Sequence, residues 1–534
     1  NKIRSFIKHA YDYVCSKNNS DIFSDEILEN LEIPYYIDAL KYCHFPSSDD
    51  YDVSNAHFEL GRQRFVIEEL LAYKLLLLDA KKTYESNKSH IFNISENAIN
   101  DFIVSLPFAL TVSQKNAISD IKNSFLKTYP TKRLIQGDVG SGKTIVAIVA
   151  SYFSKLSNLQ TGILVPTEIL ADQHANTFKK MFSGLPVKIE CLKSNLTSGE
   201  KSRIIESVQS GEIDILIGTH SIIQDNVSFL NLGLIIVDEQ HKFGINQRAL
   251  LTQKNTENPQ IPHELYLSAT PIPRSLSLVL YEGLDYTIIN ESPKNRKTIN
   301  TQIVDHENRS VLHGNISKIL HDKEQIYWVC SCIDYTESSE SEYVQGVYED
   351  LSNRFSTNSI GMLHGRVDSK ENIKTMKKFV SGKIEILVCT TMIEVGVDVA
   401  NATCIVIEDP NRFGLSQLHQ LRGRVGRSDK QSYCYLVCKN NLSDHALNRL
   451  KALELNSSGF KIAEEDLKLR GSGDYLGHKQ SGANHNFKLA TPDDALNNYD
   501  LVRESMSCVD KIGEESKNKL IKRWGKDSKE TIQL

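Results

Sequence analysis

The sequence predicts an α/β protein in which two parallel-sheet domains follow one another, with helical segments at both ends of the chain. Short β-rich runs alternate with helical runs from about residue 105 to 290, and a second block with the same alternation covers about 325 to 440. The two ends instead show the spacing of helices. Such alternation is typical of βαβ units, whose parallel strands are covered by helices.

Composition places the chain among ordinary globular proteins. Its 534 residues are 40% hydrophobic and 24% charged, and this length allows about three to five domains. The formal charge of −5 excludes a uniformly basic coat but leaves a local nucleic-acid-binding surface open. No apolar run approaches the roughly 18–20 residues that cross a bilayer, so we expect no membrane segment. The ten cysteines include no Cys-x-x-Cys pair, so we expect neither a zinc ribbon nor a redox centre.

The first hundred residues are expected to form helices. Apolar side chains recur there at three- and four-residue spacings, and charged residues fill much of the rest. The recurring positions are Phe65, Ile67, Leu70, Leu71, Leu75 and Leu78. Residues 46–50 are expected to interrupt the helices as a loop, because their sequence is Pro-Ser-Ser-Asp-Asp. This segment contains no recognisable catalytic motif.

Two blocks of strands define the expected sheets. In the first domain, residues 101–292, the β-rich runs are 133–136, 161–165, 213–217, 232–237 and 264–267. In the second domain, residues 293–440, they are 325–329, 360–363, 384–388, 403–407 and 433–437. The polar stretch 290–298 is expected to link the domains. Residues 441–534 are expected to return to helix.

The first motif that carries chemistry is a phosphate-binding loop. It reads G-x-x-x-x-G-K-T and lies between a strand-like run and a helix-like run, which is the context that the motif requires. Glycines let successive backbone N–H groups curl round a polyphosphate. Lys143 would reach the β- and γ-phosphates, and the Thr144 hydroxyl would help to hold Mg²⁺. The expected nucleotide-binding residues are Gly137, Asp138, Val139, Gly140, Ser141, Gly142, Lys143 and Thr144.

Two adjacent carboxylates supply the second part of the expected site. An apolar run delivers Asp238 to the carboxyl end of a strand, where a carboxylate can hold Mg²⁺, usually through water. Glu239 beside it can act as general base on the attacking water. The sequence has no Asn-Lys-x-Asp motif of the GTPase kind, which points to ATP.

An arginine-rich motif in the second domain is the third part. It contains Arg422, Arg424 and Arg427 within six residues. The guanidinium group is always charged and forks onto phosphate oxygens, so Arg424 and Arg427 are candidate arginine fingers. Gly423 and Gly426 argue against a simple solvated helix face. An ATP site divided between two domains would close on nucleotide, and closure is how hydrolysis becomes movement.

Together with Ser268-Ala-Thr270, these motifs resemble those of the superfamily-two helicases, whose two RecA-like lobes clamp ATP. A narrower resemblance, to the RecG family of bacterial DNA branch-migration translocases, spans nearly the whole chain. It rests on residues 106–114, 166–174, 238–244, 268–274, 327–330, 390–399 and 459–482. The last segment resembles the translocation motif that this family shares with the transcription-repair coupling factor Mfd, where a helical hairpin and loop turn lobe closure into duplex movement.

The resemblance implies ATP and Mg²⁺ as cofactors and a role for individual residues. Gln114 would read the adenine. The implied metal ligands are Thr144 and Asp238, and the implied catalytic residues are Lys143, Glu239, Arg424 and Arg427. Asp398 would contact ribose, and the implied coupling residues are Ser268, Thr270, Gly396, Arg470 and Gln480. Helix capping is the alternative for Ser268 and Thr270.

Five further residues are candidate DNA contacts. They follow strands in the two domains, where hydroxyls and backbone amides would grip phosphates, and they are Thr167, Thr219, His220, Arg366 and Thr391. Phosphate contacts carry no sequence information, which suits a motor that steps along any DNA. Each of the five is equally consistent with an ordinary loop residue.

The sequence departs from the RecG family at its start. That family has an N-terminal wedge domain, an OB-fold that splits strands at the fork, whereas residues 1–100 show no five-stranded pattern with stacking aromatics. The chain also begins with Asn1 instead of Met, so we expect truncation or a natural short form. This puts fork recognition in question, and not ATP hydrolysis.

The sequence therefore predicts an ATP-dependent DNA translocase that acts on replication forks and Holliday junctions in recombination and repair. The implied partners are branched or duplex DNA and a single-stranded-DNA-binding protein, with the chain as a cytoplasmic monomer. An Mfd-like translocase, an RNA helicase and a non-hydrolysing DNA-binding scaffold are the alternatives. The Asp-Glu-Gln-His spelling at 238–241 disfavours the RNA helicase, and the intact ATP-site residues disfavour the scaffold.

Overall fold

The computed structural model describes most of the chain in two compact units. The described residues are 2–17, 21–45, 51–240, 243–255, 260–269, 284–291, 297–331, 337–365, 369–390, 398–438, 442–470, 487–491, 494, 497–498, 501–502 and 513–525. The helical unit combines parts of both ends of the chain, from residues 1–86 and 470–534, and the α/β unit comprises 87–273 and 285–469.

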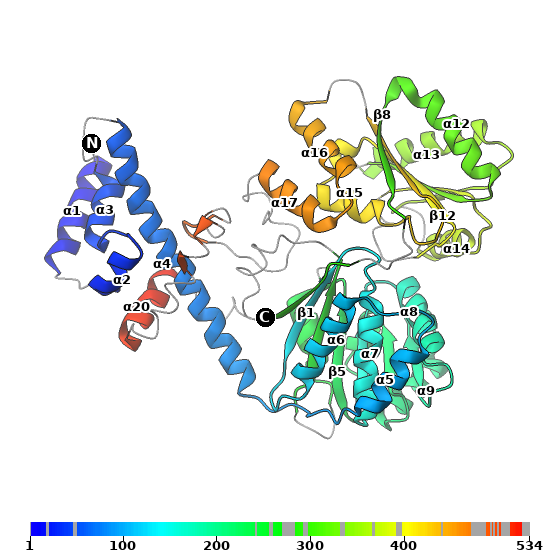
Figure 1. Cartoon of the computed structure of the whole chain (residues 1–534), viewed down its shortest axis with the longest axis horizontal. Coiled ribbons are helices and arrows are strands. Elements are labelled where there is room, and N and C mark those ends of the chain that lie inside the picture. The colour runs from blue at the N-terminus through cyan, green and yellow to red at the C-terminus, as the bar shows by residue number, and fades with distance from the viewer. Residues whose placement is uncertain are drawn as a thin grey trace. The chain divides into compact units, whose positions relative to one another are not determined.

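The α/β unit contains two lobes, and lobe 1 is built on a parallel sheet with the strand order β3-β4-β2-β5-β6-β1-β7. Its strands are β1 (Lys132–Gly137), β2 (Gln160–Leu164), β3 (Ile189–Leu192), β4 (Ile215–Gly218), β5 (Leu232–Asp238), β6 (His263–Ser268) and β7 (Asp285–Ile289). Its helices are α5 (Glu96–Ser105), α6 (Val112–Phe125), α7 (Lys143–Leu156), α8 (Glu168–Met181), α9 (Ser198–Gln209), η1 (His220–Ile223) and α10 (Ile245–Thr252). Figure 1 shows α5, α6 and α7 in front of this sheet.

Burial explains why these segments form a parallel sheet. The strands β1, β2, β4, β5 and β6 are almost continuously buried, as expected for strands covered by helices on both faces. In α7 every residue from Ile145 to Ser154 is buried, so this helix is enclosed by lobe 1. The register sets Gln136 beside Ser268, and Leu267 beside Asp238. The carboxyl ends of β1, β6 and β5 therefore lie side by side.

Lobe 2 has the same architecture, with the strand order β10-β11-β9-β12-β13-β8. Its strands are β8 (Asn300–Asp305), β9 (Gln325–Val329), β10 (Ile360–Leu363), β11 (Ile386–Cys389), β12 (Ala402–Glu408) and β13 (Tyr433–Cys438), and every pair is parallel. Its helices are η3 (His306–Asn308), α12 (Arg309–His321), α13 (Glu337–Arg354), α14 (Ser369–Val380), η5 (Pro410–Arg412), α15 (Leu415–Arg422), α16 (Asp444–Leu455) and α17 (Gly459–Arg470). The two tandem parallel sheets that the sequence predicted are confirmed.

The helical unit is organised around one long helix. Its helices are α1 (Lys2–Ser16), α2 (Asp25–Asn30), α3 (Tyr36–His44), α4 (Tyr51–Glu85) and α20 (Glu514–Trp524). Both α3 and α20 contact α4, as Figure 1 shows. The apolar positions expected to form a helix face include Ile67, Leu71 and Leu75, which are buried against Leu520 of α20 and the 22–33 segment. No helix in the described parts of the chain is both long and apolar enough to cross a membrane.

Polar contacts join the two chain ends inside the helical unit. The Glu69 carboxylate accepts hydrogen bonds from the backbone N–H groups of Lys488, Leu489 and Ala490, the last two at 2.8 and 2.7 Å. A second carboxylate, Glu68, is fully buried and pairs with Arg64 at 2.9 Å. On its other oxygen Glu68 accepts from Arg523 at 2.9 Å and from the Trp524 indole at 2.8 Å. Two adjacent carboxylates of α4 thus hold segments more than 400 residues away in sequence.

Glu68→Ala is expected to lower the free energy of unfolding of the helical unit by about 3–5 kcal/mol. It removes one of the two carboxylates that pair with the buried Arg64, and it also removes the acceptor of Arg523 and Trp524. The chain has two tryptophans. Trp524 becomes the sole tryptophan in a Trp328→Phe background, so its fluorescence during denaturant unfolding reports on this unit.

The matched control is Glu85→Ala, made on the same helix in the same background. Glu85 pairs with Lys81 at 3.9 Å, and both side chains are about 30% exposed. Its loss should change the free energy of unfolding by less than about 0.5 kcal/mol. Equal effects of the two substitutions would contradict a stabilising role for the buried network.

Candidate active site

The phosphate-binding loop has the backbone that its sequence requires. Strand β1 ends at Gly137, helix α7 begins at Lys143, and Gly140 and Gly142 between them have left-handed φ angles of +77° and +84°. A side chain at Gly142 would also collide with the amide of Gln114. Lys143 Nζ donates to the carbonyl oxygens of Gly137 at 2.8 Å and Asp138 at 3.0 Å. The ammonium group therefore lies inside the curl of the loop, where a phosphate would bind.

Gln114 braces this loop from α6. Its Oε1 accepts from the Thr111 N–H at 2.9 Å, and Thr111 Oγ1 accepts from the Gln114 N–H, which together form a capping box at the start of α6. The Nε2 of Gln114 donates to the Ser141 carbonyl at 2.9 Å. In this structure the Gln114 amide contacts protein on both sides, and its expected contact with adenine stays a prediction.

The expected acidic pair lies at the end of β5. His174 Nε2 is 2.9 Å from Asp238 Oδ2, and the Glu239 N–H donates to Asp238 Oδ1 at 3.1 Å. Glu239 has a left-handed φ of +53°, a conformation that costs a non-glycine residue about 1–2 kcal/mol. Such strain is often found at functional sites, where it aims a side chain that a relaxed backbone would direct elsewhere.

Electrostatics separates the two carboxylates. Burial raises the pKa of Glu239, and the charge of Asp238 raises it further, while Lys143 and Arg424 oppose this rise. Burial also acts to raise the pKa of Asp238, but the hydrogen bond from His174 and the charges of His174 and Lys143 outweigh it and lower that pKa. The arrangement thus favours the ionised form of Asp238 and the protonated form of Glu239 relative to ordinary carboxyl groups.

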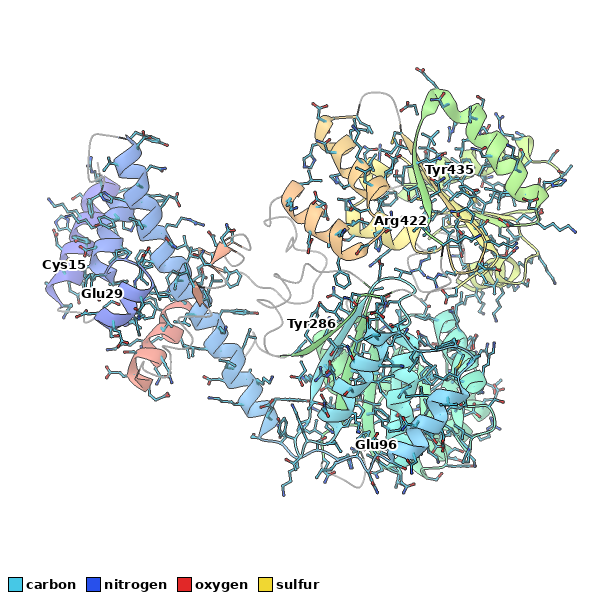
Figure 2. The ribbon with its side chains drawn as sticks, in the orientation of Figure 1. Cys15, Glu29, Glu96, Tyr286, Arg422 and Tyr435 are labelled. Carbon is cyan, nitrogen blue, oxygen red and sulfur yellow. The ribbon has the colours of Figure 1, made fainter. Side chains whose placement is uncertain are left out.

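The three arginines of lobe 2 have different surroundings. Arg422, labelled in Figure 2, is buried and donates to the carbonyl oxygens of Leu453 at 2.6 Å and Asn456 at 2.8 Å. Arg424 is buried too, and its charge acts on the Glu239 carboxyl of lobe 1. Arg427 pairs with the Asp398 carboxylate, and its Nε donates to the Gly423 carbonyl at 3.1 Å. Arg422 therefore supports the fold, whereas the charge of Arg424 acts to lower the pKa of Glu239.

The structure describes some of the other expected site residues. Ser268 ends β6 and is buried between the strands that carry the phosphate loop and the acidic pair. The Asp398 N–H donates to Gln173 Oε1 of α8 at 2.9 Å. Arg470 ends α17. Thr270, Arg366, Thr391, Gly396 and Gln480 lie outside the described residues.

The described candidate DNA contacts lie where strands end in lobe 1. Thr167 Oγ1 caps α8 by accepting from the Leu170 N–H at 3.4 Å. Thr219 is buried between β4 and η1, and the His220 ring packs edge-on against Phe243 at 5.5 Å. Thr167 and Thr219 thus have structural surroundings of their own, and DNA contact by these residues stays a prediction.

Sequence reasoning missed His174 and His419 as site residues. His174 lies on the apolar face of α8 with Leu170, Ala171, Ala175 and Phe178, all buried. A histidine at a core position of an amphipathic helix was the available signal, because a buried polar group needs a partner. Its partner, Asp238, is 64 residues away in sequence, so only the fold reveals the contact.

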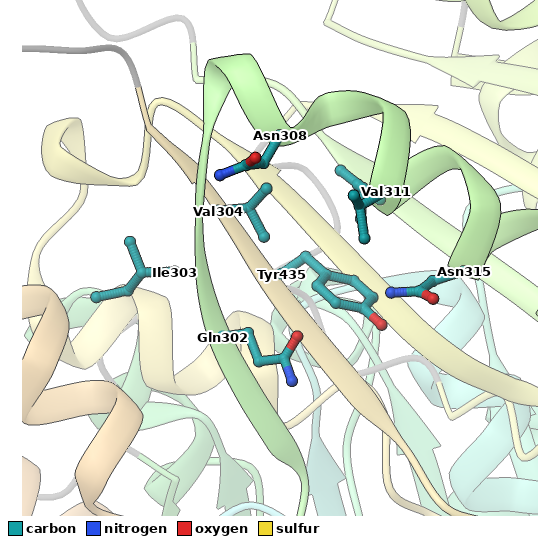
Figure 3. A pocket seen from close by; sticks show the side chains of 8 residues that line it. Gln302, Ile303, Val304, Asn308, Val311, Asn315 and Tyr435 are labelled. Atoms are coloured by element: carbon teal, nitrogen blue, oxygen red, sulfur yellow. The ribbon is translucent and has the colours of Figure 1, made fainter.

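A small pocket of about 230 Å³ lies elsewhere in lobe 2 (Figure 3). Residues of β8, α12 and β13 line it, including Gln302, Val304, Val311, Asn315 and Tyr435. None of the expected catalytic or DNA-binding residues lines this pocket. It is therefore separate from the phosphate loop and the acidic pair.

The residues of lobe 1 fit a magnesium nucleotide. The Ser141 hydroxyl of the phosphate loop is buried and has no hydrogen-bond partner within the described structure. Lys143, the α7 N-terminus and the glycine backbone supply donors for phosphate, and Asp238 and Thr144 are the oxygen ligands that Mg²⁺ prefers. This donor set matches a polyphosphate with its metal.

Comparisons with known proteins relate this chain to helicases. Family models match residues 111–279 (DEAD/DEAH box helicase), 313–429 (helicase conserved C-terminal domain) and 456–530 (ATP-dependent DNA helicase RecG, domain 3, C-terminal). The chain is 38% identical to the ATP-dependent DNA helicase RecG of Haemophilus influenzae and 39% identical to that of Bacillus subtilis, over 86% and 91% of its length. It spans 67% and 70% of those relatives. A structure of RecG bound to a three-way DNA junction aligns with a TM-score of 0.74 at 36% identity, over 91% of this chain and 62% of that one.

Proposed function

Because this chain belongs to the RecG family of ATP-dependent DNA helicases, we propose that it uses ATP hydrolysis to move along duplex DNA and to remodel branched DNA such as forks and Holliday junctions. The observation that carries the proposal is that the two lobes meet at the phosphate loop, where the Asp138 carboxylate of lobe 1 accepts from the Gly459 N–H of lobe 2 at 2.9 Å. Arg424 of lobe 2 acts on the Glu239 carboxyl of lobe 1, beside Lys143 and Asp238. Relative movement of the lobes would therefore change the ATP site directly.

The ATP site divides its work among a few side chains. Lys143 and the loop amides would bind the phosphates, and Thr144 and Asp238 would hold Mg²⁺, which supplies charge neutralisation at the phosphates. Glu239 would accept a proton from the attacking water, for which its raised pKa suits it. Arg424 and Arg427 would stabilise the charge that develops in the transition state. Arg427 must leave its Asp398 partner to do so.

Coupling and DNA contact are assigned to the remaining candidates. Residues proposed to couple hydrolysis to movement are Ser268, Thr270, Gly396, Arg470 and Gln480, and proposed phosphate contacts are Thr167, Thr219, His220, Arg366 and Thr391. We assign residues 101–292 and 293–440 to the two helicase lobes and 459–482 to the translocation motif. A cytoplasmic monomer that cooperates with a single-stranded-DNA-binding protein completes the proposal.

ATP hydrolysis should rise at least tenfold when a three-way junction or a linear duplex is added at low salt. Because phosphate contacts dominate, the DNA concentration for half-maximal stimulation should increase steeply between about 50 and 200 mM salt. The measurement compares steady-state ATPase rates with junction, linear duplex, duplex RNA and no nucleic acid. The proposal would be overturned if RNA stimulated hydrolysis and DNA did not, or if none of the nucleic acids stimulated it.

A further inference from the structure

Asp138 belongs to the phosphate loop, yet its carboxylate contacts lobe 2. One oxygen, Oδ1, accepts from the Val139 N–H at 2.7 Å and pairs with His419 Nε2 of α15. The other, Oδ2, accepts from the Gly459 N–H at 2.9 Å, at the first residue of α17. Burial acts to raise the pKa of Asp138, but the hydrogen bonds from His419, Gly459 and Val139 hold it well below the ordinary value. The phosphate loop is thereby joined to two helices of the other lobe.

A chain of hydrogen bonds extends this contact through lobe 2. His419 Nε2 donates to Asp138, so its Nδ1 is left to accept from Arg422 Nη2 at 3.0 Å. Arg422 also donates to the carbonyl oxygen of Leu453 in α16 at 2.6 Å, and to those of Asn456 and Ser457, between α16 and α17, at 2.8 and 3.2 Å. Gly459 follows this segment and opens α17. The same polar network therefore fixes both His419 and the start of α17.

Close packing leaves little freedom at this junction. A Cβ added at Gly459 would lie 2.6 Å from His419 Nε2, and one at Gly423 would lie 2.7 Å from the Val139 side chain. Both distances are shorter than real Cβ contacts allow. Backbone of lobe 2 thus lies directly against Asp138 and Val139, and a shift of the phosphate loop must move α15 and α17 or break the hydrogen bonds.

We propose that Asp138 and His419 form a latch that transmits the state of the phosphate loop to α17, the helix that opens the translocation motif. Neither side chain needs to touch ATP, so both are positioning residues. The inference rests on the proposed function, because it concerns how hydrolysis is linked to DNA movement. It gives Asp138 a role different from the nucleotide binding that its place in the G-x-x-x-x-G-K-T motif suggested.

Asp138→Asn and His419→Ala test the latch. Each should leave the dissociation constant of a fluorescent ATP analogue within about threefold of wild type and should lower the DNA-stimulated kcat at least tenfold. Both substitutions break the same contact between Asp138 and His419. The kcat of the double variant should therefore lie within about a factor of two of the kcat of the slower single variant. His419→Gln places an amide donor near the position of Nε2 and should restore at least half of the lost rate.

Translocation gives the second readout. Displacement of a third strand from duplex DNA, divided by ATP consumed, should fall at least fivefold in Asp138→Asn. The matched control is Asp214→Asn. The Asp214 carboxylate also accepts from one charged side chain and one backbone N–H, but both belong to lobe 1: the Lys155 ammonium and the Lys188 N–H, each at 2.8 Å. This control should keep wild-type coupling, and thermal unfolding of every variant confirms that it is folded.

Several outcomes would overturn the latch. One is that Asp138→Asn keeps wild-type stimulation by DNA and wild-type coupling. Another is that the reductions in kcat of the two single variants multiply in the double variant. The third is that Asp138→Asn weakens nucleotide binding by more than about thirtyfold. The last would place Asp138 among the phosphate ligands. Failure of the proposed function itself looks different, because the wild-type protein would then show no stimulation by DNA.

Discussion

Glu239→Gln is expected to lower the DNA-stimulated kcat by about 10²–10⁴-fold while ATP still binds within about threefold of wild type. The substitution keeps the size of the side chain and removes its ability to accept a proton. The residues proposed to hold nucleotide and metal, Lys143, Thr144 and Asp238, are unchanged. Single-turnover hydrolysis and binding of a fluorescent ATP analogue, measured separately, distinguish loss of chemistry from loss of binding.

The dependence of this effect on pH follows from the raised pKa of Glu239. A general base works only when it is deprotonated, so wild-type kcat should fall as the pH drops through the pKa of Glu239. Because this pKa is raised, the fall should occur at a higher pH than for an ordinary glutamate. The Glu239→Gln variant should lose that acidic limb. Glu190→Gln, on the edge strand β3 of the same lobe, is the control and should keep both rate and profile. A variant that lost ATP binding but kept its turnover per bound nucleotide would contradict the assignment.

The strands that sequence reasoning found and missed differ in their place in the sheets. The ten β-rich runs identified from the sequence all overlap strands, and nine of these ten, all but β10, are central. Within the described parts of the two lobes, the strands that it did not identify are β3, β7 and β8, and all three lie at sheet edges. Polar residues interrupt them, as in Asn300-Thr-Gln-Ile-Val-Asp305, because one side of an edge strand has no neighbour to bury it. Periodicity therefore identifies the buried centre of a parallel sheet better than its rim.

The sequence points to a candidate ATP site where the chemistry is contained in a short motif. The phosphate loop and the Asp238-Glu239 pair each carry their context in adjacent residues. The contacts of His174 with Asp238 and of His419 with Asp138 join residues 64 and 281 positions apart, so no local pattern records them. The left-handed backbone at Glu239 was equally hidden, because glutamate has no preference for that conformation.

The helical unit shows the same limit on a larger scale. Periodicity predicted α4 correctly, and Leu71 and Leu75 are in the core as expected. What periodicity cannot give is the partner of that apolar face. Here α20 and the segment near 490 pack on α4, held by the buried carboxylates Glu68 and Glu69. Buried charges in a helix face signal a distant partner without identifying it.

Lys143→Ala is expected to reduce DNA-stimulated ATP turnover below about 1% of wild type and to weaken ATP binding as well. The ammonium of Lys143 lies in the curl of the loop and is the side-chain charge best placed to meet the β- and γ-phosphates. Burial lowers its pKa, while the carboxylates of Glu239, Asp238 and Asp138 oppose this, so its charge is balanced by the site itself. Removing it leaves those carboxylates facing an incoming anion, which adds repulsion to the lost attraction.

The fold should survive this change. Lys143 donates to the Gly137 and Asp138 carbonyls of its own loop, whereas the core of lobe 1 begins two residues further along α7, at Ile145 and Val146. Circular dichroism and thermal unfolding should therefore match wild type within a few degrees. Lys188→Ala removes a lysine whose ion pair with Glu212 is exposed on the surface of lobe 1, and this control should retain full activity. A folded Lys143→Ala protein with undiminished hydrolysis would contradict the assignment of Lys143 to the β- and γ-phosphates.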